Sequence, residues 1–172
     1  MSKNETVNEL FELAIELEKD AESLYRRFAK MFAHEKDVAD FWQKYADEER
    51  GHAIFLERTR SRLTEEALSA PGDNSMLKSV HKGIKNSVNY QLQTIQTLEG
   101  AFQLATELEN SETNAIFEFI ITSFSAEELV KSHSFLRTQL KKHCNMLTDE
   151  FPTRLKSKLM RMEVNALEIE KQ

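Results

Sequence analysis

Residues 40–58 read DFWQKYADEERGHAIFLER, and this stretch decides the fold. Its apolar residues recur at steps of three and four, as on the face of an α-helix that packs inside a bundle. Two polar side chains, Glu49 and His52, stand on that face among Trp42, Tyr45 and Leu56. A carboxylate and an imidazole buried together must be paired with each other or bound to a ligand. The stretch therefore predicts a core helix that carries a polar site.

Residues 13–30, LAIELEKDAESLYRRFAK, predict the helix that packs against it. Their stripe has the same spacing and is interrupted once, by Glu18; it reads Phe11, Ala14, Glu18, Ala21, Tyr25, Phe28 and Phe32. We expect this helix over about residues 4–33, with Ser2 and Glu5 as its capping box. The next helix is expected from Asp37 into the sixties. Together these helices form an antiparallel hairpin whose core is aromatic: Phe11, Phe28, Phe32, Phe41 and Trp42.

The rest of the chain predicts a second hairpin after a break at Pro71-Gly72. Its first helix is expected to carry Val88, Gln91, Ile95, Leu98, Phe102 and Ala105. A turn is expected at residues 107–113, ELENSET, with Ser111 as the N-cap of the next helix. That last helix would carry Phe117, Ile121, Phe124, Glu128, Lys131 and Phe135.

Two hairpins joined by one long connection form an all-α, ferritin-like four-helix bundle. About 17 residues between Leu63 and Val80 are long enough to cross the length of such a bundle. We expect the bundle to occupy residues 1–147. Residues 148–172 are expected to form a short C-terminal helical extension, with Pro152 in its first turn.

Composition excludes several classes of protein. The net charge of −6 argues against nucleic acid as a partner. No apolar run approaches the roughly 18 residues that span a membrane, and the polar N-terminus predicts no signal peptide. The single cysteine, Cys144, excludes an internal disulfide and a four-cysteine metal module within this chain. We expect a cytoplasmic protein without a membrane or nucleic-acid partner.

The polar residues on the two stripes indicate a metal site. A di-iron site in a bundle takes a Glu from each of two helices and a Glu-x-x-His from each of the other two. Residues three apart lie about 60° apart around a helix, so Glu49 and His52 can reach one ion, with Glu18 facing them. Such donors suit iron or manganese, and also zinc. With 23 Glu in 172 residues one Glu-x-x-His is weak alone, and a buried polar network without metal stays an alternative.

The stretches 13–30 and 40–58 resemble the first half of rubrerythrin-like, ferritin-like di-iron proteins. The resemblance implies that Glu18, seven residues before Tyr25, is a metal ligand together with Glu49 and His52. It further implies two irons, reaction with peroxide or dioxygen, and a homodimer. The chain lacks the cysteines of a rubredoxin module, so electrons would come from a separate donor protein. Whether the chain is a non-haem iron oxidoreductase stays open, and no catalytic residue is assigned.

Two further readings stay beside this one. The chain could bind or store metal without turnover, or it could be a structural or interaction bundle that has lost full metal-site chemistry. Both are favoured by the second half of the chain, which departs from the pattern of the family. Superposing the stripes puts Ile95 where the third helix should supply a Glu. It puts Glu128 and Lys131 where the second Glu-x-x-His should stand.

The charges of the predicted ligands indicate how many metal ions the site holds. Glu18, Glu49 and the fourth predicted ligand, Glu128, carry −3, and Lys131 adds +1. The remaining −2 matches one divalent ion, so we expect an incomplete site in which Lys131 replaces the charge of a second metal. A shifted register would bring in reserve ligands: Gln91, Glu99 and Glu127. Two sets are expected at the surface or helix ends: the histidines His34, His81, His133 and His143, and the solvated carboxylates Glu16, Glu22, Glu48 and Glu57.

Overall fold

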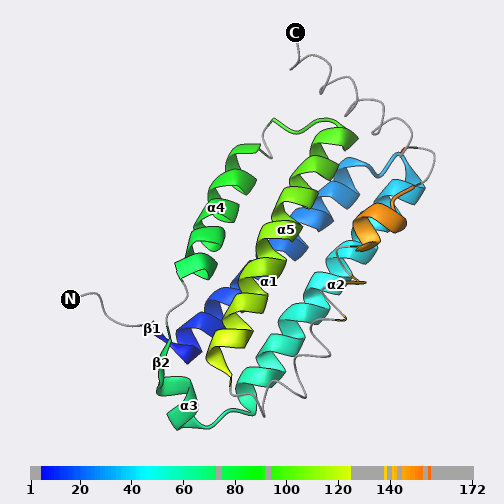
Figure 1. Ribbon diagram of the computed structural model, residues 1–172. Helices are drawn as coiled ribbons and strands as arrows, with labels where there is room; N and C mark the ends of the chain where they lie inside the picture. The colour runs from blue at the N-terminus through cyan, green and yellow to red at the C-terminus, as the bar shows by residue number, and fades with distance from the viewer. Residues whose placement is uncertain are drawn as a thin grey trace.

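The computed structural model describes residues 5–72, 75–91, 94–124, 138, 141–142, 145–152 and 155. Its described elements are almost entirely helical, as predicted, and they form a ferritin-like helical bundle (Figure 1). In chain order they are β1 Glu5–Thr6, α1 Val7–Met31, α2 Lys36–Ser61, α3 Glu65–Ser69, β2 Pro71–Gly72, α4 Ser75–Gln91 and α5 Leu98–Ser123. None of these described helices is long and apolar enough to cross a membrane.

The hairpin of α1 and α2 agrees with the prediction. Helix α1 ends in a tight turn in which the Glu35 N–H donates to the Phe32 carbonyl at 2.9 Å. So short a connection between two helices forces them to pack antiparallel. The helix begins, however, at a different cap from the one predicted. Thr6 and Glu9 form the capping box, and Ser2 lies outside the described residues.

The connection after α2 is longer than predicted. It spans residues 62–97 and contains α3, β2 and α4. Figure 1 shows that α4 carries the chain back along the bundle to the end at which α5 begins, and α4 contacts both α1 and α5. The predicted third helix was therefore wrong, because Val88 lies in α4, Leu98 lies in α5, and Ile95 lies in the connection between them.

The predicted turn at residues 107–113 was also wrong, since α5 continues through it. The polar residues Asn110 and Ser111 are exposed, while Leu108 and Ala115, seven residues apart, are both buried. Seven residues are two helical turns, so one apolar stripe passes through the polar segment unbroken. The helix starts instead at Thr97, whose side-chain oxygen accepts a hydrogen bond from the Gly100 N–H at 3.1 Å.

A two-stranded ribbon ties the start of α1 to the connection. In it Glu5 pairs with Gly72 and Thr6 with Pro71, in antiparallel register. The approach is close, because a Cβ built on Gly72 would lie 2.6 Å from Cδ1 of the buried Leu10. A side chain at this position would therefore have to displace the buried Leu10 side chain.

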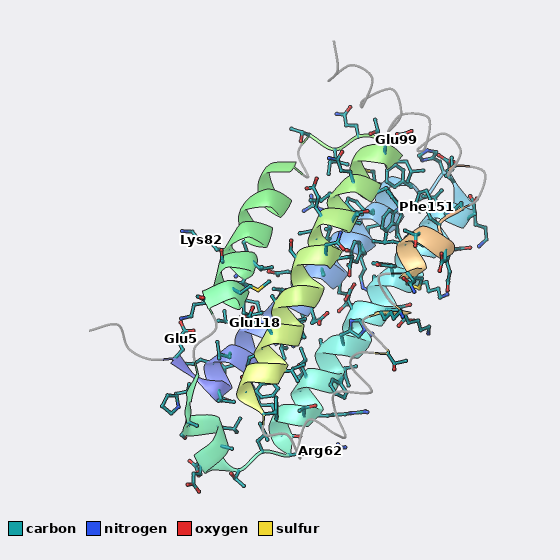
Figure 2. All side chains as sticks on the ribbon, viewed as in Figure 1. Glu5, Arg62, Lys82, Glu99, Glu118 and Phe151 are labelled. Atoms are coloured by element: carbon teal, nitrogen blue, oxygen red, sulfur yellow. The ribbon has the colours of Figure 1, made fainter. Side chains whose placement is uncertain are left out.

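The core lies between α1, α2 and α5 and is rich in aromatic side chains, as predicted. The Tyr25 and Trp42 rings stack with centroids 5.7 Å apart, and Phe28 meets Trp42 edge-on. Phe151, labelled in Figure 2, packs on Phe41 and Phe102 with centroids 5.2 and 4.7 Å away. Burying each such ring stabilises the fold by about 1.5–3 kcal/mol. The division between residues 147 and 148 stays a prediction, as most of residues 148–172 lie outside the described part.

Candidate metal centre

Glu18, Glu49 and His52 meet in the interface between α1 and α2. The two glutamates are each 1% exposed, and the His52 side chain is 13% exposed. His52 Nδ1 lies 3.2 Å from an Oε2 of Glu49 and 3.5 Å from an Oε2 of Glu18. One donor atom from each residue lies within 4.8 Å of the other two. The structure therefore brings together the three predicted ligands of the first hairpin.

Local sequence explains why these polar groups fit inside. Glu49 and His52 are one turn apart on α2, and the antiparallel hairpin sets Glu18 of α1 against them. A small residue lies one turn before and one turn after each glutamate on its helix, and all four are buried: Ala14, Ala21, Ala46 and Ala53. Short side chains at these positions reduce crowding around the two buried carboxylates. Tyr25, Trp42 and Tyr45 are also fully buried in the same hairpin and help to keep water out.

Burial and mutual charge shape the titration of the group. Desolvation raises the pKa of Glu18 to about 7, although His52 opposes that shift. Desolvation also disfavours the His52 imidazolium, but the two adjacent carboxylates outweigh it and raise the pKa of His52 to about 10. At neutral pH the metal-free triad therefore holds a charged imidazolium between two acidic groups. A cation that took this place would have to displace the proton of His52.

The donor set fits a divalent transition metal. Ligand bonds of about 2.1 Å in tetrahedral or octahedral geometry put neighbouring donors roughly 3.0–3.4 Å apart. The 3.2 and 3.5 Å separations from His52 Nδ1 lie close to that range. The Oε2 of Glu18 is buried and makes no hydrogen bond among the described residues. Two carboxylates with −2 charge and one imidazole are suitable ligands for iron, manganese or zinc.

Several predicted residues of the second hairpin lie elsewhere or outside the described part. Glu128, Lys131 and Glu127 fall outside the described residues. Of the other reserve ligands, Glu99 lies in the first turn of α5, labelled at the end of the bundle in Figure 2, and only the backbone of Gln91 is described. Ile95 packs partly buried against the core from outside any helix. It therefore does not occupy a ligand position in a bundle helix.

One buried carboxylate, Glu109, was not among the residues predicted from the sequence. It lies on α5, is 3% exposed, and accepts a hydrogen bond from the hydroxyl of the buried Tyr25. The signal was present in the spacing Ala105, Glu109 and Ile116, which follows one helical face once the turn at 107–113 is discarded. Tyr25 lies seven residues from Glu18, about two turns or roughly 10 Å along α1. The third helix of the bundle thus does carry an interior glutamate.

Comparison with known proteins matches the chain to the family Rubrerythrin over residues 9–128. No curated protein and no solved structure matches it. The matched segment includes α1, α2 and α5, and with them Glu18, Glu49, His52 and Glu109. It covers well over half of the 172 residues. The chain belongs to the rubrerythrin family and carries, in its first hairpin, carboxylate and histidine groups that are able to bind a metal.

Proposed function

We propose that the protein binds iron between α1 and α2, with Glu18, Glu49 and His52 as ligands. The observation that carries this proposal is the buried triad, in which Glu18 presents an oxygen with no hydrogen bond from the described residues. That oxygen is paired with the His52 ring at 3.5 Å, so the missing hydrogen bond costs only part of the penalty of a fully unsatisfied buried atom, which is about 1–3 kcal/mol. A bound cation removes that cost and matches the −2 charge of the two glutamates.

We propose one fully occupied metal ion, as the charge arithmetic predicted. We do not count the buried Glu109 as a ligand of this ion, because it accepts a hydrogen bond from Tyr25, which lies about two turns along α1 from Glu18. Glu128 stays a proposed further ligand. Manganese or zinc would satisfy the same donors, so metal analysis has to cover all three elements.

When bound, iron would supply reaction with peroxide or dioxygen at an open coordination position. The chain's own residues would hold and insulate it. Glu18 and Glu49 supply negative charge, and His52 directs Nδ1 at both carboxylates. Tyr25 and its aromatic neighbours restrict water on one side. We further propose a separate electron-donor protein, a homodimer and a cytoplasmic location.

Metal content per chain tests the proposal. The protein is expressed with iron supplementation, and iron, manganese and zinc are measured in the wild type and in Glu49→Gln. Glu48→Gln is the matched control, because it makes the same change one residue away, at a side chain that is not buried. We expect about one iron per chain in the wild type and the control, and a loss of iron of at least tenfold in Glu49→Gln. Equal metal in all three folded proteins would refute the assignment of the ligands.

Peroxide consumption then tests the redox part of the proposal. Reduced, iron-loaded wild type is mixed with a known amount of peroxide, and the residual peroxide is measured against Glu49→Gln. Faster consumption by the wild type supports an oxidoreductase. Equal rates would identify a metal-binding protein without turnover.

A second candidate function is a structural or interaction bundle without metal. The charged His52 between two carboxylates favours it, because such a triad is already neutralised in part by its own proton. This reading expects no iron at the triad of the wild type and an unchanged fold on loading with iron. The same metal measurement therefore decides between the two candidates.

A further inference from the structure

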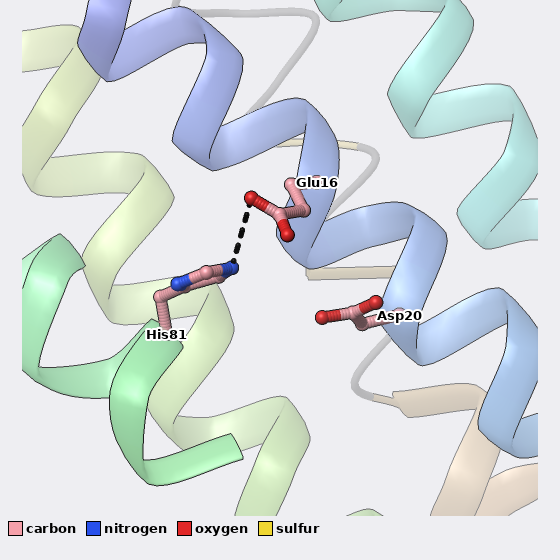
Figure 3. Close-up of side chains that lie close together, drawn as sticks. All are labelled: Glu16, Asp20 and His81. Carbon is pink, nitrogen blue, oxygen red and sulfur yellow. Dashed lines mark ion pairs between the residues drawn. The ribbon is translucent and has the colours of Figure 1, made fainter. Parts of the chain in front are cut away.

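A second group of donors lies between α1 and the connecting helix α4. Glu16 and Asp20 are one turn apart on α1, and His81 of α4 faces them, as Figure 3 shows. His81 Nε2 lies 3.3 Å from Oε2 of Glu16. One donor atom of each residue lies within 4.8 Å of the others. Glu16 and Glu18 are two residues apart, about 200° around the helix, so this group and the interior triad lie on different faces of α1.

The expectation that His81 is a surface residue was wrong. Its side chain is only 12% exposed, because α4 packs against α1 at this point. Glu16 is exposed, as expected, with 46% of its side chain accessible to solvent. The group is therefore open to solvent at Glu16 and closed at His81. An ion would have an entry path on one side and a sheltered ligand on the other.

Two polar atoms in this group are buried without a hydrogen bond from the described residues. They are Nε2 of His81 and Oδ2 of Asp20. The contact between His81 and Glu16 is close enough for an ion pair but lacks the geometry of a hydrogen bond. Buried polar atoms in proteins nearly always have a partner, and those that lack one call for an explanation such as an ion.

The spacing of the donors suits zinc. Ligand bonds of about 2.0–2.1 Å in a tetrahedron put neighbouring donors roughly 3.3 Å apart, which matches the separation between His81 and Glu16. Two carboxylates and one imidazole make three protein ligands, and water can take the fourth position at the exposed edge. The two carboxylates neutralise the charge of one divalent ion.

In the metal-free protein, Lys85 neutralises part of the negative charge of the two carboxylates. It lies one turn after His81 on α4, and its ammonium donates to Glu16. Its side chain is about half exposed, so it can swing into solvent when a divalent ion takes its place. Lys85 therefore acts as a competitor for the ion and not as a ligand.

We propose that Glu16, Asp20 and His81 form a second metal site that binds a divalent ion such as zinc. The ion clips α4 to α1 on the outside of the bundle. The ion pair between Lys78 and Glu5, at 2.9 Å, also joins α4 to the segment that leads into α1. A metal bound at this site strengthens the attachment of α4, and so of the connection over residues 62–97, to α1. The site does not depend on the proposed function, because it shares no ligand with the interior triad.

Zinc binding to the full chain tests this proposal. Zinc per chain and zinc affinity are measured by equilibrium dialysis in the wild type, in Glu49→Gln and in His81→Gln. His34→Gln is the control, because its side chain is 70% exposed and belongs to neither group. We expect Glu49→Gln to keep one zinc site. The double variant Glu49→Gln/His81→Gln is expected to bind zinc at that site more than about a hundredfold more weakly than Glu49→Gln. His34→Gln in the same background is expected to bind as tightly as Glu49→Gln alone.

Lys85→Met separates a metal site from a merely structural contact. Removing the competing charge of this exposed ion pair is expected to raise zinc affinity by about two- to fivefold, whereas loss of an ordinary ion pair would leave it unchanged. The proposal is overturned if Glu49→Gln binds no zinc, or if His81→Gln binds as tightly as its parent. Circular dichroism of each variant checks that the fold is retained. If the triad does not bind metal, Glu49→Gln and the wild type will contain the same amount of metal. That result would leave the effect of His81→Gln on zinc binding unchanged, so the two proposals can be tested separately.

Discussion

Replacing Tyr25 by Phe removes one hydroxyl from the interior and leaves the ring in place. Tyr25 is fully buried, and its hydroxyl donates to Glu109, which is 3% exposed. The ring stacks on Trp42 at 5.7 Å and meets Tyr45 edge-on at 4.9 Å. A Phe ring can keep both contacts. The substitution therefore isolates the hydrogen bond that joins α1 to α5.

The size of the effect follows from the burial of both partners. A hydrogen bond to a charged acceptor contributes about 1.5–3 kcal/mol, and the apolar contacts of the ring are unchanged. We expect Tyr25→Phe to lower the free energy of unfolding by about 2 kcal/mol. In a protein of this length, that change corresponds to a fall in Tm of about 4–8 °C.

A double-mutant cycle measures this hydrogen bond directly. Tyr25→Phe, Glu109→Met and the double variant are unfolded in urea without metal, with circular dichroism and Trp42 fluorescence as probes. Met has nearly the length of Glu and no strong acceptor, so the double variant removes both polar partners. We expect a coupling energy of about 1.5–3 kcal/mol. Single effects that add to within about 0.5 kcal/mol would refute the reasoning.

Two further predictions concern backbone space and pH. Gly72→Ala should lower the free energy of unfolding by about 1–3 kcal/mol, because its new Cβ would clash with Leu10. Gly51→Ala should raise the free energy of unfolding by about 0.5–1 kcal/mol, because nothing lies within 4 Å of its new Cβ. Urea melts that rank the two variants the other way would contradict this. The pKa values of Glu18 and His52 are both raised in the folded, metal-free protein, to about 7 and about 10. The folded state then binds more protons than the unfolded state, so their contribution to stability is present at low pH and is lost between about pH 4.5 and 10. Melting from pH 5 to 9 should show a steeper fall for the wild type than for Glu18→Gln/His52→Gln, and parallel profiles would disprove it.

The first hairpin and its donors could be predicted from the sequence because the information is local. The stripes of α1 and α2 have regular spacing, and Glu18, Glu49 and His52 interrupt them at matching depth. Four residues of turn then leave the two helices little freedom in how they pack. The triad follows once the hairpin is drawn.

The second half could not be predicted in the same way. Both α4 and α5 are amphipathic, and periodicity does not say which of two such helices belongs to the bundle core. The sequence analysis joined parts of both into one helix, and so it placed Ile95 where Glu109 should have been considered. The capping box failed for a related reason. The same motif occurs at Ser2 and at Thr6, and the structure uses the second, directly after the strand that pairs with β2.

The group around His81 was beyond local sequence reasoning. Glu16 and Asp20 have the spacing of neighbours on a helix, but so do many solvated carboxylates. Their relation to His81 arises only from the packing of α4 on α1, more than 60 residues later in the chain. No spacing rule within one helix carries that information.

The interior triad has a consequence for the order in which the protein is made. Its three donors lie within residues 18–52, and the turn that joins their helices is only a few residues long. Closing so short a loop costs little chain entropy, and chains fold from the N-terminus as they are synthesised. The hairpin of α1 and α2 ends at Ser61 and α5 begins at Leu98, so all three donors are synthesised well before α5. The proposed metal site could thus form on a nascent chain before the bundle that later encloses it exists.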